Sequence, residues 1–292
     1  MEPATKKPEL IVIVGPTASG KSDLALKIAQ GFSGEIIAAD SRTIYKGMDV
    51  GTAKPSAKEQ KLVPHWGLDL VEPGAVFSAY QFKNYAKQKI AEIQKRGKLP
   101  VLVGGGGLYI DSVLFDFDFV NQADQQQRER LEKLTVEQLQ KLIEELEYLM
   151  PENKNNRRYL IRTIERKGLT GTKSSVNNNV LIIGLMPAAE ELKKRIFERA
   201  ETYFEQGLLQ ETKELLNKYG ENALKKTNGI AYITSMKLLK NEINQEEAIE
   251  VIQKQEWQYA RRQRTWFKRN KSIHWFESAE QAYKEIVRIL NN

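Results

Sequence analysis

The part of this sequence that most constrains its fold is an eight-residue loop, Gly15–Ser22, which matches the pattern G-x-x-x-x-G-K-S. A short apolar run, Leu10–Val14, precedes the loop, and the residues from Lys21 to Phe32 have the pattern of a helix. A loop of this kind between a buried strand and a helix turns backbone N–H groups and the helix N-terminus toward a phosphate. Its lysine adds a full charge, and its serine adds a hydroxyl for Mg²⁺. The sequence therefore predicts a phosphate-binding loop at the start of an α/β domain.

Short apolar runs and helical patterns alternate after the loop. Further strands are predicted at Glu35–Asp40, Leu99–Val103, Val180–Leu185 and Ser272–Phe276, with a long helix at Ala79–Arg96 and a last helix near the C-terminus. Strands that alternate with helices are typical of a parallel sheet covered by helices on both faces. We therefore expect a P-loop NTPase-like parallel sheet flanked by helices.

A polar stretch rich in Gln, Glu and Arg begins near Asp116 and interrupts this alternation. Thr135 with Gln138 has the pattern of a capping box, and the Asn-rich segment Ser174–Asn179 reads as a turn. Helical spacing is approximated by Leu131, Leu139, Leu142, Leu146 and Leu149. We predict that residues 1–116 form the first part of the P-loop core and that 117–179 form a helical insertion. Residues 180–292 would then return to the core and end in a basic, helical C-terminal region.

The composition excludes several kinds of protein. The 292 residues include no cysteine and two histidines, so a disulfide framework and a cysteine-ligated zinc site are excluded, and a histidine-rich metal site is not expected. The N-terminal residues hold no apolar run long enough for a signal peptide or a membrane span, so we expect a cytoplasmic protein with no membrane partner. The net charge is +7, and its clustering near the C-terminus favours a polyanionic partner. The clustered cations are Lys254, Arg261, Arg262, Arg264, Lys268, Arg269 and Lys271.

The ends of two predicted strands distinguish between kinds of P-loop protein. Nucleotide hydrolases and switches commonly place a magnesium-binding acid after a later apolar strand. Here Leu99–Val103 runs instead into Gly104–Gly107, which has no side chain for a metal but allows a ligand close to the backbone. The acid that does end a strand is Asp40, which should lie beside the loop because parallel strands end in one crevice. Asp40 could act there as a general base, or it could cap the next helix.

Further segments carry a family resemblance. They are GPTASGKS (Gly15–Ser22), ADS (Ala39–Ser41), Tyr45, GMDVGTAKP (Gly47–Pro55), VPH (Val63–His65), LVGG with GLY (Leu102–Gly105 and Gly107–Tyr109), RIFERAETYFEQGLLQE (Arg195–Glu211) and RRQRTWF (Arg261–Phe267). In this order, and over nearly the whole chain, the set resembles the tRNA dimethylallyltransferase (tRNA isopentenyltransferase) family.

The resemblance implies transfer of a dimethylallyl group from dimethylallyl diphosphate to the exocyclic amine of the adenosine at position 37 of tRNA, beside the anticodon, giving isopentenyladenosine. Lys21 and Thr17 would act on the donor, Ser22 would bind the expected cofactor Mg²⁺, and Asp40 would accept the proton of the amine. The residues implied to bind the diphosphate are Gly15, Pro16, Thr17, Ala18, Ser19, Gly20, Lys21 and Ser22.

The same resemblance implies tRNA contacts that involve the insertion and the C-terminal region, and we expect a monomer. The implied tRNA-binding residues are Asp40, Ser41, Arg42, Thr43, Gly106, Arg158, Arg162, Arg261, Arg262, Gln263 and Arg264. Several positions depart from the family pattern, among them Arg42 and Thr43, which stand where Met-Gln or a similar pair is common. Gly106 replaces a usual threonine, whereas Tyr159 and Ile233 stand where basic residues are frequent. We expect these changes to affect the acceptor side more than the donor side.

Other functions compete with this one. An adenylate isopentenyltransferase would use the same donor with a free nucleotide, although the insertion and the basic C-terminal region have little purpose for so small an acceptor. A P-loop small-molecule or nucleotide kinase would turn over ATP, and a non-catalytic RNA-binding protein would tolerate loss of Asp40. A long-chain prenyl synthase is disfavoured because the sequence has no DDxxD motif.

Overall fold

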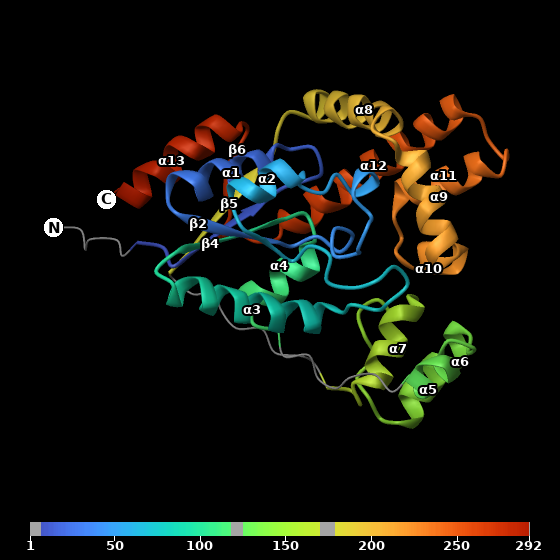
Figure 1. The fold of residues 1–292 in the computed structure, drawn as a ribbon. Helices are drawn as coiled ribbons and strands as arrows, with labels where there is room; N and C mark the ends of the chain where they lie inside the picture. The colour runs from blue at the N-terminus through green and yellow to red at the C-terminus, as the bar shows by residue number, and fades with distance from the viewer. Residues whose placement is uncertain (1–6, 118–124, 170–178, 292) are drawn as a thin grey trace. The chain divides into compact units, whose positions relative to one another are not determined.

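The centre of the molecule is a six-stranded sheet in which neighbouring strands are parallel, in the order β3-β2-β4-β1-β5-β6 (Figure 1). The computed structural model describes residues 7–117, 125–169 and 179–291. The strands are β1 (Leu10–Val14), β2 (Gly34–Ala38), β3 (His65–Trp66), β4 (Leu99–Gly104), β5 (Val180–Leu185) and β6 (His274–Phe276). This topology confirms the predicted P-loop NTPase-like parallel sheet.

Helices connect and cover these strands. In the first part of the chain they are α1 (Lys21–Gly31), the 3₁₀ turn η1 (Val50–Thr52), α2 (Ala57–Leu62), α3 (Ala79–Lys95) and α4 (Gly107–Leu114). After β5 they are α8 (Ala189–Glu205), α9 (Leu208–Tyr219), α10 (Glu221–Lys226), α11 (Ile230–Leu239), α12 (Gln245–Phe267) and α13 (Ala279–Asn291). No helix among the residues that the structure describes is long and apolar enough to cross a membrane.

Strand β1 is buried along its whole length because it pairs with β4 on one side and β5 on the other. Helices α1 and α13 cover one face of the sheet, and α3 and α4 lie on the other (Figure 1). On the first face, Ile11 and Ile13 pack with Leu24 and Ile28 of α1 and with Ile286 of α13. Burial on both faces explains why β1 is an uninterrupted apolar run.

The predicted elements of this sheet agree closely with the structure. The strands at Leu10–Val14 and Val180–Leu185 have the predicted bounds, and α1 begins at Lys21 as predicted. Strand β2 ends at Ala38, two residues earlier than predicted, so Asp40 lies in the loop after the strand. This position places Asp40 at the end of the sheet from which the phosphate-binding loop also leaves.

The chain divides into two compact units, of which residues 115–175 form the second. This unit contains α5 (Gln125–Leu131), α6 (Val136–Glu145) and α7 (Arg157–Glu165). The predicted capping box is present, since Gln138 N donates to Thr135 Oγ1 at 3.3 Å and Thr135 N donates to Gln138 Oε1 at 2.9 Å. The predicted insertion bounds at residues 117 and 179 stay a prediction, and the turn expected from Ser174 lies outside the described residues up to 178.

The apolar side chains of the second unit only partly follow the predicted helical spacing. Leu139 of α6 is fully buried and packs with Leu160 and Ile164 of α7. Leu146 and Leu149, however, lie beyond the end of α6 and are exposed by 40% and 80%. A cap at Thr135 fixes where this helix starts, but the leucine pattern alone did not fix where it ends.

Candidate active site

The loop Gly15–Ser22 connects the end of β1 to the start of α1. Gly20 caps α1 in the left-handed region at φ 85°, and Ala18 also has a positive φ of 60°. Ser19 N donates to Pro16 O at 3.3 Å, which closes the turn within the loop. Free N–H groups at a helix start attract an anion, so the conformation fits phosphate binding.

Lys21 lies across this loop. Its Nζ donates to Pro16 O at 3.1 Å. Loss of solvation lowers the pKa of Lys21 to about 8, while the nearby Asp40 raises it and the guanidinium of Arg199 lowers it further. A cation held in so poorly solvated a position, beside a second cation, is poised to gain strongly from an anionic ligand.

Arg199 of α8 is a site residue that the sequence patterns did not reveal. Its Nη2 donates to Thr17 Oγ1 at 2.6 Å and to Glu256 Oε2 at 2.5 Å. The other oxygen of Glu256 accepts from Tyr203 OH at 3.1 Å. Glu256 is only 7% exposed, and the ion pair with Arg199 balances its charge inside the protein. The arrangement fixes a guanidinium against the phosphate-binding loop.

Gln263 of α12 joins the loop to the glycine run. Its Oε1 accepts from Thr17 N at 2.8 Å, and its Nε2 donates to Gly105 O at 2.9 Å. The side chain is 5% exposed, so it faces inward and not toward solvent. The family resemblance predicts that Gln263 contacts tRNA, and this stays a prediction; in the structure each end of its amide makes a hydrogen bond within the protein.

Other parts of the protein pack closely against the glycine run. A Cβ on Gly104 would lie 2.1 Å from Ala39 O, and one on Gly105 would lie 2.1 Å from Gln263 Nε2. At Gly106 the corresponding distance to Ala39 O is 2.8 Å. Glycine is thus required where β4 ends because the chain after β2 and helix α12 press against it. The space that a magnesium-binding acid would need at the end of β4 is thus occupied by Ala39 and Gln263.

Asp40 and the residues after it form a tight turn at the end of β2. Asp40 Oδ1 accepts from Arg42 N at 2.8 Å. The guanidinium of Arg42 lies over the ring of Tyr259, 4.3 Å from its centroid, and its Nε donates to Asn228 O at 3.3 Å. Ser41 is exposed, whereas Thr43 is buried and its Oγ1 has no hydrogen-bond partner. The turn aims one carboxylate and one stacked cation at the same space.

That space is a pocket at the carboxyl ends of the strands. Its walls come from the phosphate-binding loop, the turn after β2, η1, α8, α11 and α12. The lining residues are Thr17, Asp40, Arg42, Gly51, Thr52, Arg199, Tyr203, Ile230, Glu256 and Tyr259. The structure therefore brings Thr17 and Asp40 together, as predicted from the strand ends.

The basic C-terminal stretch forms the end of α12. Arg261 and Arg262 are exposed, and Arg264 is half-buried. Its solvent-facing hollow is lined by Gln258, Arg261, Arg262, Thr265, Trp266 and Arg269. The buried stripe of the same helix includes Ile252, Ala260 and Phe267 but also Glu256 and Gln263. One face of α12 thus presents arginines outward, while the other brings Glu256 to the pocket and Gln263 to the phosphate-binding loop.

The two arginines predicted in the second unit lie on α7. Arg158 is exposed and Arg162 is half-buried. Burial lowers the pKa of Arg162, and the cationic neighbours Arg158 and Arg166 lower it further. Like charges held this close favour an anion such as an RNA phosphate.

Metal binding at this site would depend on the bound substrate, because its phosphates would supply part of the metal's coordination shell. Within residues 7–117, 125–169 and 179–291, no three His, Asp or Glu side chains gather as a metal site. Ser22 is exposed in the first turn of α1. Mg²⁺ often takes one or two protein ligands and completes its shell with substrate phosphates and water. The exposed hydroxyl fits such a shared site.

These features define a class of protein before any comparison. A parallel sheet with a phosphate-binding loop after β1, an aspartate in the turn after β2 and glycine where a magnesium-binding acid would stand describes a P-loop α/β protein. Its pocket combines anion binding with a carboxylate that can accept a proton.

Comparison with known proteins places the chain in one family within this class. The family model described as "IPP transferase" matches residues 43–270, and the chain belongs to this family. It is 38% identical to a tRNA dimethylallyltransferase of Staphylococcus epidermidis, over 96% of this chain and 90% of the relative. It is 39% identical to that of Halothermothrix orenii, over 95% and 90%.

Solved structures that resemble this chain agree with its membership of the family. A full-length tRNA isopentenylpyrophosphate transferase from Bacillus halodurans is 33% identical, with a TM-score of 0.74, and the match covers 98% of this chain and 97% of that one. A eukaryotic dimethylallyltransferase acting on tRNA is 25% identical with a TM-score of 0.78, over 92% and 73%.

Proposed function

We propose that this protein transfers the dimethylallyl group of dimethylallyl diphosphate to the exocyclic amine of an adenosine in tRNA, at position 37 beside the anticodon. The observation that carries the proposal is the pocket that both Thr17 of the phosphate-binding loop and Asp40 line. Family membership selects this reaction over the other chemistries that such a pocket could perform.

The donor diphosphate would bind at the loop Gly15–Ser22. Lys21 and the loop N–H groups would hold its oxygens. Arg199, which is hydrogen-bonded to Thr17 of the loop, would also contact the diphosphate. As the bond from the allylic carbon to oxygen breaks, negative charge grows on the departing diphosphate. Fixed cations and N–H dipoles stabilise that charge more in the transition state than in the bound donor.

The proposal includes Mg²⁺, for which Ser22 and the diphosphate would both be ligands. When bound, it would neutralise charge on the leaving group. Ser22 is exposed in the first turn of α1, and Lys21 and Arg199 would supply two further positive charges.

The acceptor would enter beside Asp40. The adenine amine is a weak nucleophile because its lone pair is delocalised into the ring. As its nitrogen bonds to the allylic carbon, the C–O bond to diphosphate breaks, and the proton of the amine passes to the Asp40 carboxylate. The base must first leave the stack of the anticodon loop, at a cost of roughly a few kcal/mol.

Binding of the tRNA would rest on the arginines of two regions. Arg261, Arg262 and Arg264 of α12 and Arg158 and Arg162 of α7 are proposed to contact phosphates. Gln263 would act differently, as a residue that positions Thr17 and Gly105. A monomer acting in the cytoplasm, where tRNA is modified, completes the proposal.

The test is mass spectrometry of tRNA after incubation with the protein, dimethylallyl diphosphate and Mg²⁺. The expected result is one dimethylallyl group on one adenosine of the anticodon loop. Modification of free AMP but not of tRNA would indicate an adenylate isopentenyltransferase. Consumption of ATP with no prenylated product would indicate a kinase and would overturn the proposal.

A further inference from the structure

The segment Gly47–Pro55, sequence GMDVGTAKP, has so far no role in the reaction. It contains the 3₁₀ turn η1, whose residues Gly51 and Thr52 line the pocket beside Asp40. Lying outside the central sheet, η1 takes no support from strand pairing. Something else must therefore fix this wall of the pocket.

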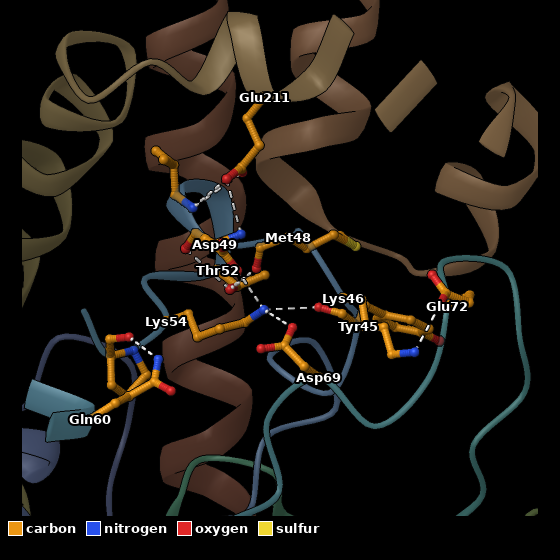
Figure 2. Close-up of polar contacts among 12 residues, drawn as sticks. Tyr45, Lys46, Met48, Asp49, Thr52, Lys54, Gln60, Asp69, Glu72 and Glu211 are labelled. Atoms are coloured by element: carbon orange, nitrogen blue, oxygen red, sulfur yellow. Dashed lines mark hydrogen bonds and ion pairs between the residues drawn. The ribbon is translucent and has the colours of Figure 1, made fainter. Parts of the chain in front are cut away.

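Glu211 of α9 provides that support. Its carboxylate accepts a hydrogen bond from Asp49 N at 3.1 Å (Figure 2). It also accepts from the next two N–H groups, Val50 N at 3.0 Å and Gly51 N at 3.4 Å. These are the donors at the start of η1 that have no partner within the turn. A carboxylate on such donors makes charge-assisted bonds, which are stronger than neutral ones.

Tyr232 of α11 completes the support. Its OH donates to Glu211 Oε1 at 2.5 Å and accepts from Gly51 N at 3.1 Å. Burial, together with the adjacent Glu211, raises the pKa of Tyr232, so the phenol keeps its proton and remains a donor. A Cβ on Gly51 would lie 2.8 Å from the ring of Tyr232, so the turn packs directly against it.

The other end of the segment is tied as well. Lys54 Nζ donates to Tyr45 O at 2.9 Å, to Asp49 Oδ1 at 2.5 Å and to Asp69 Oδ1 at 2.6 Å (Figure 2). Only 2% of the Lys54 side chain is exposed, so this cation is fully engaged in holding the turn. Thr52 Oγ1 likewise donates to Met48 O at 2.6 Å.

We infer that Glu211 is a positioning residue, which holds η1 as the acceptor-side wall of the pocket and thereby sets how well the target base binds. This rests on the proposed function. Charge decides which substrate the wall faces. The loop side of the pocket carries Arg199, and Lys21 lies close enough to interact with its charge, so this side suits a diphosphate. Gly51 and Thr52 instead present a neutral surface. A neutral base suits that surface better than a diphosphate does.

Steady-state kinetics of Glu211→Gln test the inference. The amide keeps the size of the side chain but has one acceptor oxygen in place of two and turns an NH₂ toward backbone donors. We expect KM for an anticodon stem-loop to rise about tenfold, as one lost charge-assisted interaction implies, with KM for dimethylallyl diphosphate unchanged. Tyr232→Phe should raise the same constant by a smaller factor.

Matched controls separate positioning from stability. Glu214→Gln changes an exposed carboxylate on the same helix, which accepts a hydrogen bond from Gln210, and should leave both KM values unchanged. Glu211→Asp keeps the charge and should recover part of the lost acceptor affinity. If Glu211 were merely structural, Glu211→Gln would lower the melting temperature and the fraction of active enzyme, with both KM values unchanged.

An unchanged KM for the stem-loop in Glu211→Gln, or an equal rise in both KM values, would overturn the inference. The proposed function fails separately, if the wild-type protein assayed alongside does not prenylate the stem-loop at all.

Discussion

Gln263 Oε1 accepts a hydrogen bond from Thr17 N at 2.8 Å, although 246 residues separate the two in sequence. The same amide donates to Gly105 O, so one side chain of α12 connects the phosphate-binding loop to the end of β4. The helix that carries the exposed arginines is therefore attached directly to the proposed donor site. We therefore expect a substitution at Gln263 to affect the proposed donor site.

Gln263→Ala should destabilise the protein and weaken donor binding. Thr17 N and Gly105 O would lose their partner in a buried position, which costs about 2 kcal/mol of unfolding free energy. Thermal unfolding and KM for dimethylallyl diphosphate measure the two effects. Gln255→Ala, at an exposed position of the same helix, should change neither.

Asp40→Asn should lower kcat by roughly 10²–10⁴-fold, because the amide cannot accept the proton of the amine. The new side chain is isosteric with the carboxylate, and its oxygen can still accept from Arg42 N, so the turn should survive. Single-turnover kinetics measure the loss, and filter binding of the stem-loop should be nearly unchanged. A variant with wild-type kcat would remove Asp40 from the reaction.

KM for dimethylallyl diphosphate should depend on pH through Lys21. Its pKa of about 8 is lowered from 10.5, so the ammonium is present below pH 8 and is lost as the pH rises above it. Donor binding needs the charged form, so KM should be flat from pH 7 to about 8 and then rise. The inflection should vanish in Lys21→Ala, which binds donor weakly throughout, and persist in Lys27→Ala, an exposed lysine of the same helix.

Arg199→Leu should reduce both stability and kcat, for separable reasons. It leaves the buried Glu256 without its cation, a loss of about 3–5 kcal/mol. Adding Glu256→Gln removes the unpaired charge and should restore much of the melting temperature. The kcat should stay about 10²–10³-fold low, because the charge on the leaving diphosphate still lacks its guanidinium. Full recovery of kcat in the double variant would make Arg199 structural only.

Arg261→Ala should weaken stem-loop binding and reduce its dependence on salt. Arg261 is exposed on α12, and each phosphate contact contributes about one to the slope of log K against log salt. Titrations between low and moderate salt should show the slope fall by about one. Arg288→Ala, which removes a surface cation paired with Glu285 on α13, should leave the slope unaltered.

The parts of the protein predicted from sequence are those with a local physical cause. The strand Leu10–Val14 is an apolar run because both of its faces are buried, and the capping box at Thr135 is complete within four residues. The loop Gly15–Ser22 likewise needs only its own glycines and the helix that follows. Asp40 could be placed near it because parallel strands end at one edge of the sheet.

The remaining site residues depend on partners far along the chain. Glu256 and Gln263 share a helix face with Ile252 and Phe267, but their polarity conceals that they are buried. Arg199 appears in sequence as one more surface cation of an amphipathic helix, yet it pairs with a carboxylate 57 residues away. The sequence by itself determined the phosphate-binding loop and the sheet that carries it. Only the tertiary structure decided which polar side chains turn inward, because a buried charge or amide is stable only where a distant partner replaces its lost water.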